Sequence, residues 1–92
     1  MSASDDYWVM TDEIRTIIKQ HGRLASDADS LANDADLYQA GMSSHARINV
    51  MLALENHFDV ELPDRMLTRS VFESIASIEA ALTELRAEAT LR

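Results

Sequence analysis

The chain has 92 residues, 47% of them hydrophobic, and its 16 acidic residues outnumber its 8 lysines and arginines to give a formal net charge of −8. This length predicts one small domain covering residues 1–92. Scattered basic residues on an acidic chain argue against nucleic-acid binding, because phosphate contacts need clustered lysines and arginines. Without cysteine, the protein has no disulfide, no thiolate metal ligand and no thiol nucleophile of its own.

The hydropathy pattern argues against a membrane or secreted protein. Crossing a membrane takes a run of about 18 or more apolar residues, and the sequence has none. Residues 1–6 are acidic and lack the apolar core of a signal peptide. We therefore expect a cytoplasmic protein whose acidic surface keeps it soluble or suits basic partner surfaces.

The first periodic segment predicts a helix that ends at Gly22, since glycine readily adopts the conformation that terminates helices. Ser4 or Thr11 could cap its start, because a hydroxyl there accepts a hydrogen bond from a free backbone N–H. Residues at helical spacing form its apolar face, with Trp8 near the edge: Tyr7, Met10, Ile14, Ile17, Ile18 and His21.

Residues 23–43 form a long connection, and connections of this length are often functional or contain a short helix. Leu24, Leu31 and Leu37 are expected to hold it against the core.

Calcium binding by this connection is an alternative with little support. The start Asp27-x-Asp29 is similar to an EF-hand loop. However, the third ligand position is a leucine, Ala32 replaces the turn glycine and Tyr38 replaces the closing glutamate. We therefore expect no metal site.

A second helix is expected to begin at Ser43 or Ser44 and to end near Phe58. Gly41 gives the backbone the freedom to turn into this helix. Its buried stripe is expected to contain Val50, Met51, Leu54 and Phe58, with Ile48 and Leu52 alongside.

Two further helices are expected after Pro63, which suits the first turn of a helix. The first is short and contains Asp64, Met66 and Leu67. The second is capped by Ser74, or begins a few residues earlier at a capping box over residues 70–73. Its apolar stripe is Ile75, Ile78, Leu82 and Leu85.

The expected fold class is therefore all-α: a small bundle of three main helices and one short helix, with a long first loop. The core is expected to join side chains from all three main helices: Ile14, Ile17 or Ile18, Val50, Leu54, Phe58, Ile78 and Leu82.

Ser44 is the residue that indicates a function. It stands at the start of a helix after a glycine turn, where free N–H groups and the helix dipole favour a phosphate. Residues 36–64 resemble the acyl carrier protein family, in which a serine at this position carries a phosphopantetheine arm. The resemblance covers nearly the whole chain and rests on Leu37, Gly41, residues 51–55, residues 58–64 and residues 71–75.

The flanking residues differ from those of the fatty-acid carriers. Ser43 replaces the usual aspartate, and His45 replaces the usual leucine or methionine. Arg47 adds a positive charge, and Glu55 is the one acid left between Ser44 and Phe58. Neutral or basic residues stand where those carriers have exposed acids: Ala46, Asn49, Asn56 and His57.

These differences make the chain more similar to free-standing bacterial aminoacyl carrier proteins. That resemblance implies a carrier that is not an enzyme. A phosphopantetheinyl transferase would attach 4′-phosphopantetheine from coenzyme A to Ser44. An amino acid:carrier protein ligase related to class II aminoacyl-tRNA synthetases would load an amino acid as a thioester, and a downstream acceptor enzyme would receive it. We expect a monomer that meets its partners through Met42, Ser43, His45 and Arg47.

Two other functions stay open. The cargo could be an acyl group for fatty acid or polyketide-type synthesis. Alternatively, the protein could be an unmodified helical interaction module in which Ser43 and Ser44 only cap a helix. A hydrolase pair of Ser44 and His45 is disfavoured, because adjacent helical residues point about 100° apart and the sequence has no nucleophile-elbow motif.

Overall fold

The computed structural model describes the backbone of residues 3–90 and the side chains of residues 10–88. It contains three α-helices, α1 (Ala3–His21), α2 (Ser44–Phe58) and α3 (Ile75–Thr90), and two single turns of 3-10 helix, η1 (Ala28–Ser30) and η2 (Asp64–Met66). The expected all-α class is confirmed. The expected short helix is the 3-10 turn η2, and the first loop contains η1.

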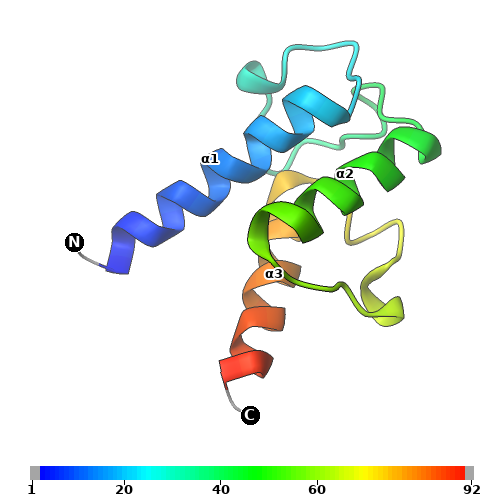
Figure 1. Cartoon of the computed structure of the whole chain (residues 1–92). Coiled ribbons are helices and arrows are strands. Elements are labelled where there is room, and N and C mark those ends of the chain that lie inside the picture. Colours follow the sequence, from blue (N-terminus) through cyan, green and yellow to red (C-terminus); the bar gives the residue numbers. More distant parts are fainter. Residues whose placement is uncertain (1–2, 91–92) are drawn as a thin grey trace.

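Helix α1 is the element that packs against both of the other α-helices. It contacts α2, α3 and η1. Residues 23–43 fold over one end of the molecule, where they lie beside the end of α1 and the start of α2 (Figure 1). The start of α2 therefore lies at the surface, at the end of the molecule that the long loop covers.

The core lies where the inner faces of the three helices meet, and most of the expected core residues are confirmed. Phe72, in the connection before α3, is the largest of the fully buried side chains. The others, by decreasing volume, are Ile14, Ile18, Leu37, Leu54, Ile75, Ile78, Leu82 and Val50. The expected side chains of Tyr7 and Trp8 in the first helix lie outside the described residues.

The prediction for the buried face of α2 is wrong in part. Ala46, Val50 and Leu54 follow each other at intervals of one turn and face the core. Ile48 and Leu52 are 47% and 48% exposed. Phe58 is only partly buried, because it is the last residue of α2 and packs against the edge of the core.

This arrangement sets the expected effect of truncating Phe58. A fully buried phenylalanine costs about 3–5 kcal/mol when replaced by alanine. Phe58→Ala should cost less than that, and Leu54→Ala should cost more than Phe58→Ala, because Leu54 has no exposed surface. Urea unfolding of the two variants measures the difference. The reverse order would show that α2 presents a different face to the core.

Arg15 of α1 binds the long loop directly. Its Nη1 donates to the backbone oxygens of Ala28 at 2.6 Å and Leu31 at 2.7 Å, and its Nη2 donates to the side chain of Asn33. Two hydrogen bonds then join the loop to the start of α3: Ala76 N to Asn33 O at 2.8 Å, and Leu37 N to Glu73 O at 2.7 Å. The loop is therefore fixed at several points along its length.

The leucines of the loop pack as expected, and its aspartates serve local structure. Leu37 is fully buried, and Leu24 and Leu31 are partly buried against the core. Asp27 caps η1 by accepting a hydrogen bond from Asp29 N at 3.0 Å. Lys19 Nζ lies 2.6 Å from Asp29 Oδ2, and its hydrogen bond lowers the pKa of the Asp29 carboxyl.

The helix ends differ in detail from the predictions. Thr11 lies inside α1, so it does not cap that helix. The left-handed residue after α1 is Arg23, with φ +52°, and not Gly22. Gly22 is still required, because a Cβ there would lie 2.7 Å from Ile18 O.

Helix α3 is capped by Ser74, and not by residues 70–73. Ser77 N donates to Ser74 Oγ, and Ser74 N donates to Ser77 Oγ, both at 3.0 Å. The reciprocal pair is a capping box in which serine replaces the usual glutamate.

Candidate functional site

The turn that leads into α2 needs a glycine. Gly41 has φ +119°, and a Cβ at this position would lie 2.7 Å from Ala25 N. The turn is closed by hydrogen bonds from Gly41 N to Tyr38 O at 3.1 Å and from Met42 N to Leu37 O at 3.0 Å. These contacts fix the direction in which the chain enters α2.

The two serines at the start of α2 have different roles. Ser43 is the N-cap, and its Oγ accepts a hydrogen bond from Ala46 N at 3.0 Å. Ser44 is the first helical residue and is exposed. Within the described part of the chain, its hydroxyl forms no hydrogen bond. Ser43 therefore completes the helix start, and the hydroxyl of Ser44 stays free.

The surroundings of Ser44 suit an anionic substituent. The first turn of α2 contains no acidic residue, so the positive end of the helix dipole is not neutralised there. Ala46 N is bound by the cap and Arg47 N donates to Ser43 O at 2.9 Å. In the described residues, the N–H groups of Ser44 and His45 have no partner. They are donors that a phosphate on the serine could use.

The expected partner residues lie at different depths. Ser43 and His45 are exposed, and Arg47 is half-buried with its guanidinium 5.8 Å from the centre of the Phe72 ring. Met42 is only 3% exposed, because the turn folds its side chain into the core. Met42 thus supports the turn from the core side and is not part of the exposed surface. Ala46, which was expected at an exposed position, is also buried.

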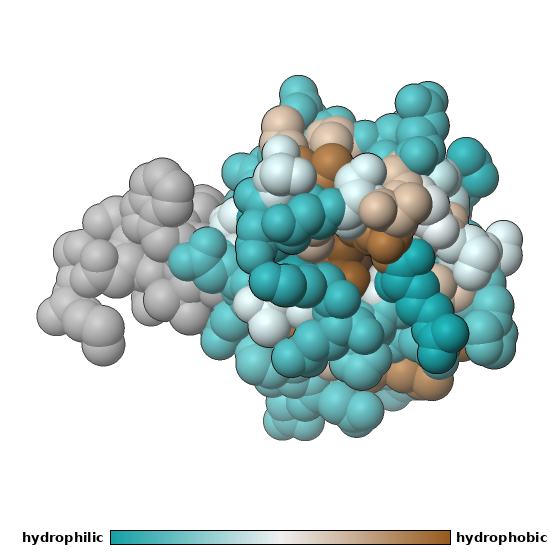
Figure 2. Space-filling model, turned by 90° about the horizontal axis from the view of Figure 1, so that it is seen from above, coloured by the Kyte–Doolittle hydropathy of each residue, from teal (hydrophilic) through white to brown (hydrophobic). Residues whose placement is uncertain are grey.

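Ile48 and Leu52 are surface features that the sequence analysis missed. They lie four and eight residues after Ser44, and residues at this spacing share a helix face. Both side chains are about half exposed. Figure 2 views the end of the molecule formed by the loop and the start of α2, and shows a mainly hydrophilic surface around a hollow with hydrophobic residues. Counting turns from Ser44, and not from the apolar run, would have identified Ile48 and Leu52.

Glu55 has a structural role that the sequence did not reveal. Its Oε2 accepts a hydrogen bond from Leu62 N at 2.8 Å, and its backbone oxygen accepts one from Val60 N at 3.1 Å. It therefore organises the connection after α2, where Asp59 is left-handed with φ +54°.

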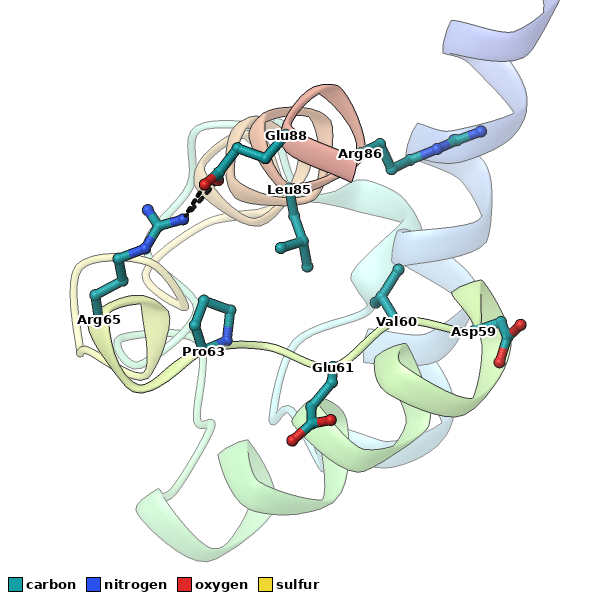
Figure 3. Close-up of a pocket in the computed structure, with 8 residues that line it drawn as sticks. All are labelled: Asp59, Val60, Glu61, Pro63, Arg65, Leu85, Arg86 and Glu88. Atoms are coloured by element: carbon teal, nitrogen blue, oxygen red, sulfur yellow. Dashed lines mark hydrogen bonds and ion pairs between the residues drawn. The ribbon is translucent and has the colours of Figure 1, made fainter. Parts of the chain in front are cut away.

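A pocket of about 490 Å³ lies between this connection, η2 and the second half of α3 (Figure 3). Arg65 borders it and pairs with Glu88 at 2.5 Å and Glu84 at 3.5 Å. Val60, Pro63 and Leu85 supply apolar surface. Because this pocket adjoins the C-terminal end of α2, it is separated from Ser44 by the length of that helix, about 20 Å.

Tyr38 leaves one polar atom without a partner. Its hydroxyl is buried and forms no hydrogen bond within the described part of the chain, while its ring lies under the guanidinium of Arg69. An unpaired buried hydroxyl costs stability. We expect Tyr38→Phe to raise the free energy of unfolding by about 1 kcal/mol. Chemical denaturation measures this change, and a loss of stability would show that the hydroxyl has a partner such as water.

Comparisons with known proteins identify the family of the chain. Residues 12–82 match the family model described as a phosphopantetheine attachment site. The chain is 46% identical over 70 residues to the aminoacyl carrier protein of Agrobacterium fabrum, covering 76% of this chain and 84% of that protein. The protein belongs to the phosphopantetheine-binding carrier protein family, whose domain bears a covalent 4′-phosphopantetheine.

Solved structures give the same result at the level of the fold. One is an engineered Bradyrhizobium japonicum glycine:[carrier protein] ligase complexed with carrier protein from Agrobacterium tumefaciens and ATP. The match has a TM-score of 0.79 and 43% identity, and covers 82% of this chain and 97% of the other. Another is the Bradyrhizobium japonicum ligase complexed with glycylated carrier protein, with a TM-score of 0.70 and 26% identity over 79% of this chain and 97% of the other. The resemblance to aminoacyl carrier proteins is thus confirmed.

No helix in the described part of the chain is long and apolar enough to cross a membrane.

Proposed function

We propose that this protein holds an aminoacyl group as a thioester on a 4′-phosphopantetheine arm attached to Ser44 Oγ. The observation that carries the proposal concerns Ser44, which is exposed at the start of a helix that Ser43 already caps, and whose hydroxyl forms no hydrogen bond with the described residues. The similarity to an aminoacyl carrier protein over most of the chain supports the choice of cargo.

The residues of this chain bind and present, and they do not catalyse. The N–H groups of Ser44 and His45 would receive the phosphodiester, and Gly41 sets the direction of the helix start. When attached, the arm supplies the thiol that holds the cargo. Within the described residues, no base is hydrogen-bonded to the Ser44 hydroxyl, so we propose that the transferase supplies one.

The proposed partners are a phosphopantetheinyl transferase, an amino acid:carrier protein ligase and a downstream acceptor enzyme. The ligase is supported by the complexes of similar carrier proteins with a glycine:carrier protein ligase. The surface next to the arm comprises the half-buried Arg47 and four exposed residues, Ser43, His45, Ile48 and Leu52. We propose that the protein acts as a single-domain monomer in the cytoplasm.

Two successive measurements test the proposed function. Intact-mass spectrometry after incubation with coenzyme A, Mg²⁺ and a promiscuous phosphopantetheinyl transferase should show one added arm. The modified protein should then be loaded by the engineered Bradyrhizobium japonicum ligase with glycine, or by its own ligase with another amino acid from a panel. An unchanged mass contradicts the carrier function. Loading with fatty acids but with no amino acid would identify an acyl carrier.

Charge at Arg47 should matter more for loading than charge at Glu55. The Arg47 side chain lies one turn from Ser44, whereas the Glu55 carboxylate is engaged by Leu62 N, and glutamine keeps an oxygen that can accept this bond. We expect Arg47→Glu to slow ligase loading more than Glu55→Gln.

Loading rates across a salt series check this expectation. The wild-type rate should depend only weakly on salt, because few exposed acids lie on α2 to be screened. A steep salt dependence, with Glu55→Gln the more damaging change, would indicate recognition through an acidic patch.

A further inference from the structure

Two arginines, Arg47 in α2 and Arg69 in the connection before α3, each lie within cation–π distance of an aromatic ring. The guanidinium carbon of Arg47 lies 5.8 Å from the centre of the Phe72 ring, and that of Arg69 lies 4.0 Å from the centre of the Tyr38 ring. The two rings belong to neighbouring segments, because Leu37 N donates to Glu73 O at 2.7 Å. Each arginine therefore contacts a ring next to the junction between the turn that precedes Ser44 and the connection that precedes α3.

These two charges differ from the other basic side chains described in detail above. Arg15 binds the loop backbone, Lys19 pairs with Asp29, and Arg65 pairs with Glu84 and Glu88. Within the described residues, neither Arg47 nor Arg69 forms an ion pair. Their positive charges are therefore left without a carboxylate partner on a strongly acidic chain.

A cation–π contact prepares an arginine for binding a carboxylate. A ring within cation–π distance attracts the guanidinium and restricts its movement, while N–H groups that are not directed at the ring can still donate hydrogen bonds. A carboxylate matches this edge with two parallel bonds. Two such side chains, one in the first turn of α2 and one in the connection before α3, can fix both the position and the orientation of a partner.

We propose that Arg47 and Arg69 form a carboxylate-binding surface by which the protein docks on the enzyme that loads its arm. The inference rests on the proposed function, since it concerns the recognition step before loading. Because the rest of the protein is acidic, such a surface acts at short range. It selects the orientation of a bound partner and does not accelerate the encounter.

The phosphodiester of the arm is the other anion that could lie here. A protein without the arm has no phosphodiester. It therefore distinguishes binding of a partner carboxylate by the arginines from binding of the arm's own phosphodiester. The test uses the Ser44→Ala protein as a competitive inhibitor of glycine loading onto wild-type holo protein by the engineered Bradyrhizobium japonicum ligase. Into this inhibitor we introduce Arg47→Met, Arg69→Met or both, because methionine keeps a long flexible stem against the ring and removes the charge.

Each substitution should raise the inhibition constant by about tenfold, and the pair should raise it further. Arg86→Met removes one positive charge near the far end of α3 and should leave the constant unchanged. Arg47→Lys and Arg69→Lys keep the charge without the flat fork and should give intermediate values. The lysine variants also replace a methionine variant in this test if that variant is too unstable to remain folded.

An inhibition constant that both arginine substitutions leave unchanged overturns the proposal. A higher KM for the holo variants with no change in the arm-free inhibitor also overturns it, and assigns the arginines to the phosphodiester. Wild-type holo protein that accepts no amino acid removes the proposed function and this inference with it. If wild-type holo protein is loaded normally but the arginine substitutions leave the inhibition constant unchanged, the inference is wrong and the proposed function stands.

Discussion

Ser44→Ala should remain folded and gain no mass on incubation with coenzyme A and a phosphopantetheinyl transferase. The substitution removes the proposed attachment oxygen, and within the described residues this hydroxyl makes no hydrogen bond to lose. Stability should therefore change by less than about 0.5 kcal/mol, as at ordinary surface positions. Intact-mass spectrometry and a thermal melt measure the two quantities on the same sample.

Ser43→Ala is the matched control, because it removes the same group one residue earlier. It should still be modified, but it should lose about 1 kcal/mol of stability, since its Oγ caps α2 through Ala46 N. The two variants thus have opposite expected results. Modification that persists in Ser44→Ala, or that disappears in a folded Ser43→Ala, would assign the arm to the other serine.

Gly41→Ala should be among the most destabilising substitutions in the chain, with a loss of about 3 kcal/mol or more. Its φ of +119° is one that residues with a Cβ rarely adopt, and the added carbon would lie 2.7 Å from Ala25 N, which is backbone and cannot rotate away. Because Gly41 directs the chain into α2, a folded variant should also be modified more slowly.

Gln39→Ala controls for changes within the same turn. The Gln39 side chain is exposed, so its loss should alter the free energy of unfolding by no more than about 0.5 kcal/mol. Urea unfolding compares both variants with the wild type. A Gly41→Ala protein as stable as the Gln39→Ala protein would mean that the turn relaxes at little cost into another conformation.

The parts of the fold that depend on neighbours in the sequence could be predicted. Apolar spacing located the three helices, and Gly41 with the two serines located the start of α2. The buried face of α2 could not be derived in the same way, because residues 50–54 are apolar without interruption and give no unique period. In the structure the buried face is Ala46, Val50 and Leu54, and a small residue such as Ala46 is a weak hydrophobic signal in the sequence.

The contacts that hold the long loop also lie beyond local reasoning. Nothing in the sequence indicates that Arg15 meets the carbonyls of Ala28 and Leu31, since these bonds depend on how the loop folds back over α1. For the same reason Met42 was expected at the surface and is buried. The position of Ser44 at the start of a helix was easier to predict than its surroundings because a turn followed by a cap is a short-range pattern.

The cap of α2 and the free hydroxyl belong to two different serines, Ser43 and Ser44. This arrangement bears on how far the backbone differs between the unmodified, modified and loaded protein. A substituent on Ser44 Oγ would leave the bond between Ser43 Oγ and Ala46 N in place, so nothing at the helix start would have to open for the proposed attachment. Empty, armed and loaded molecules can then share one backbone, and the Ala46 amide should exchange with deuterium at the same rate in all three. An enzyme that must distinguish these forms has to sense the arm and its cargo, because the shape of the carrier itself conveys no information about either.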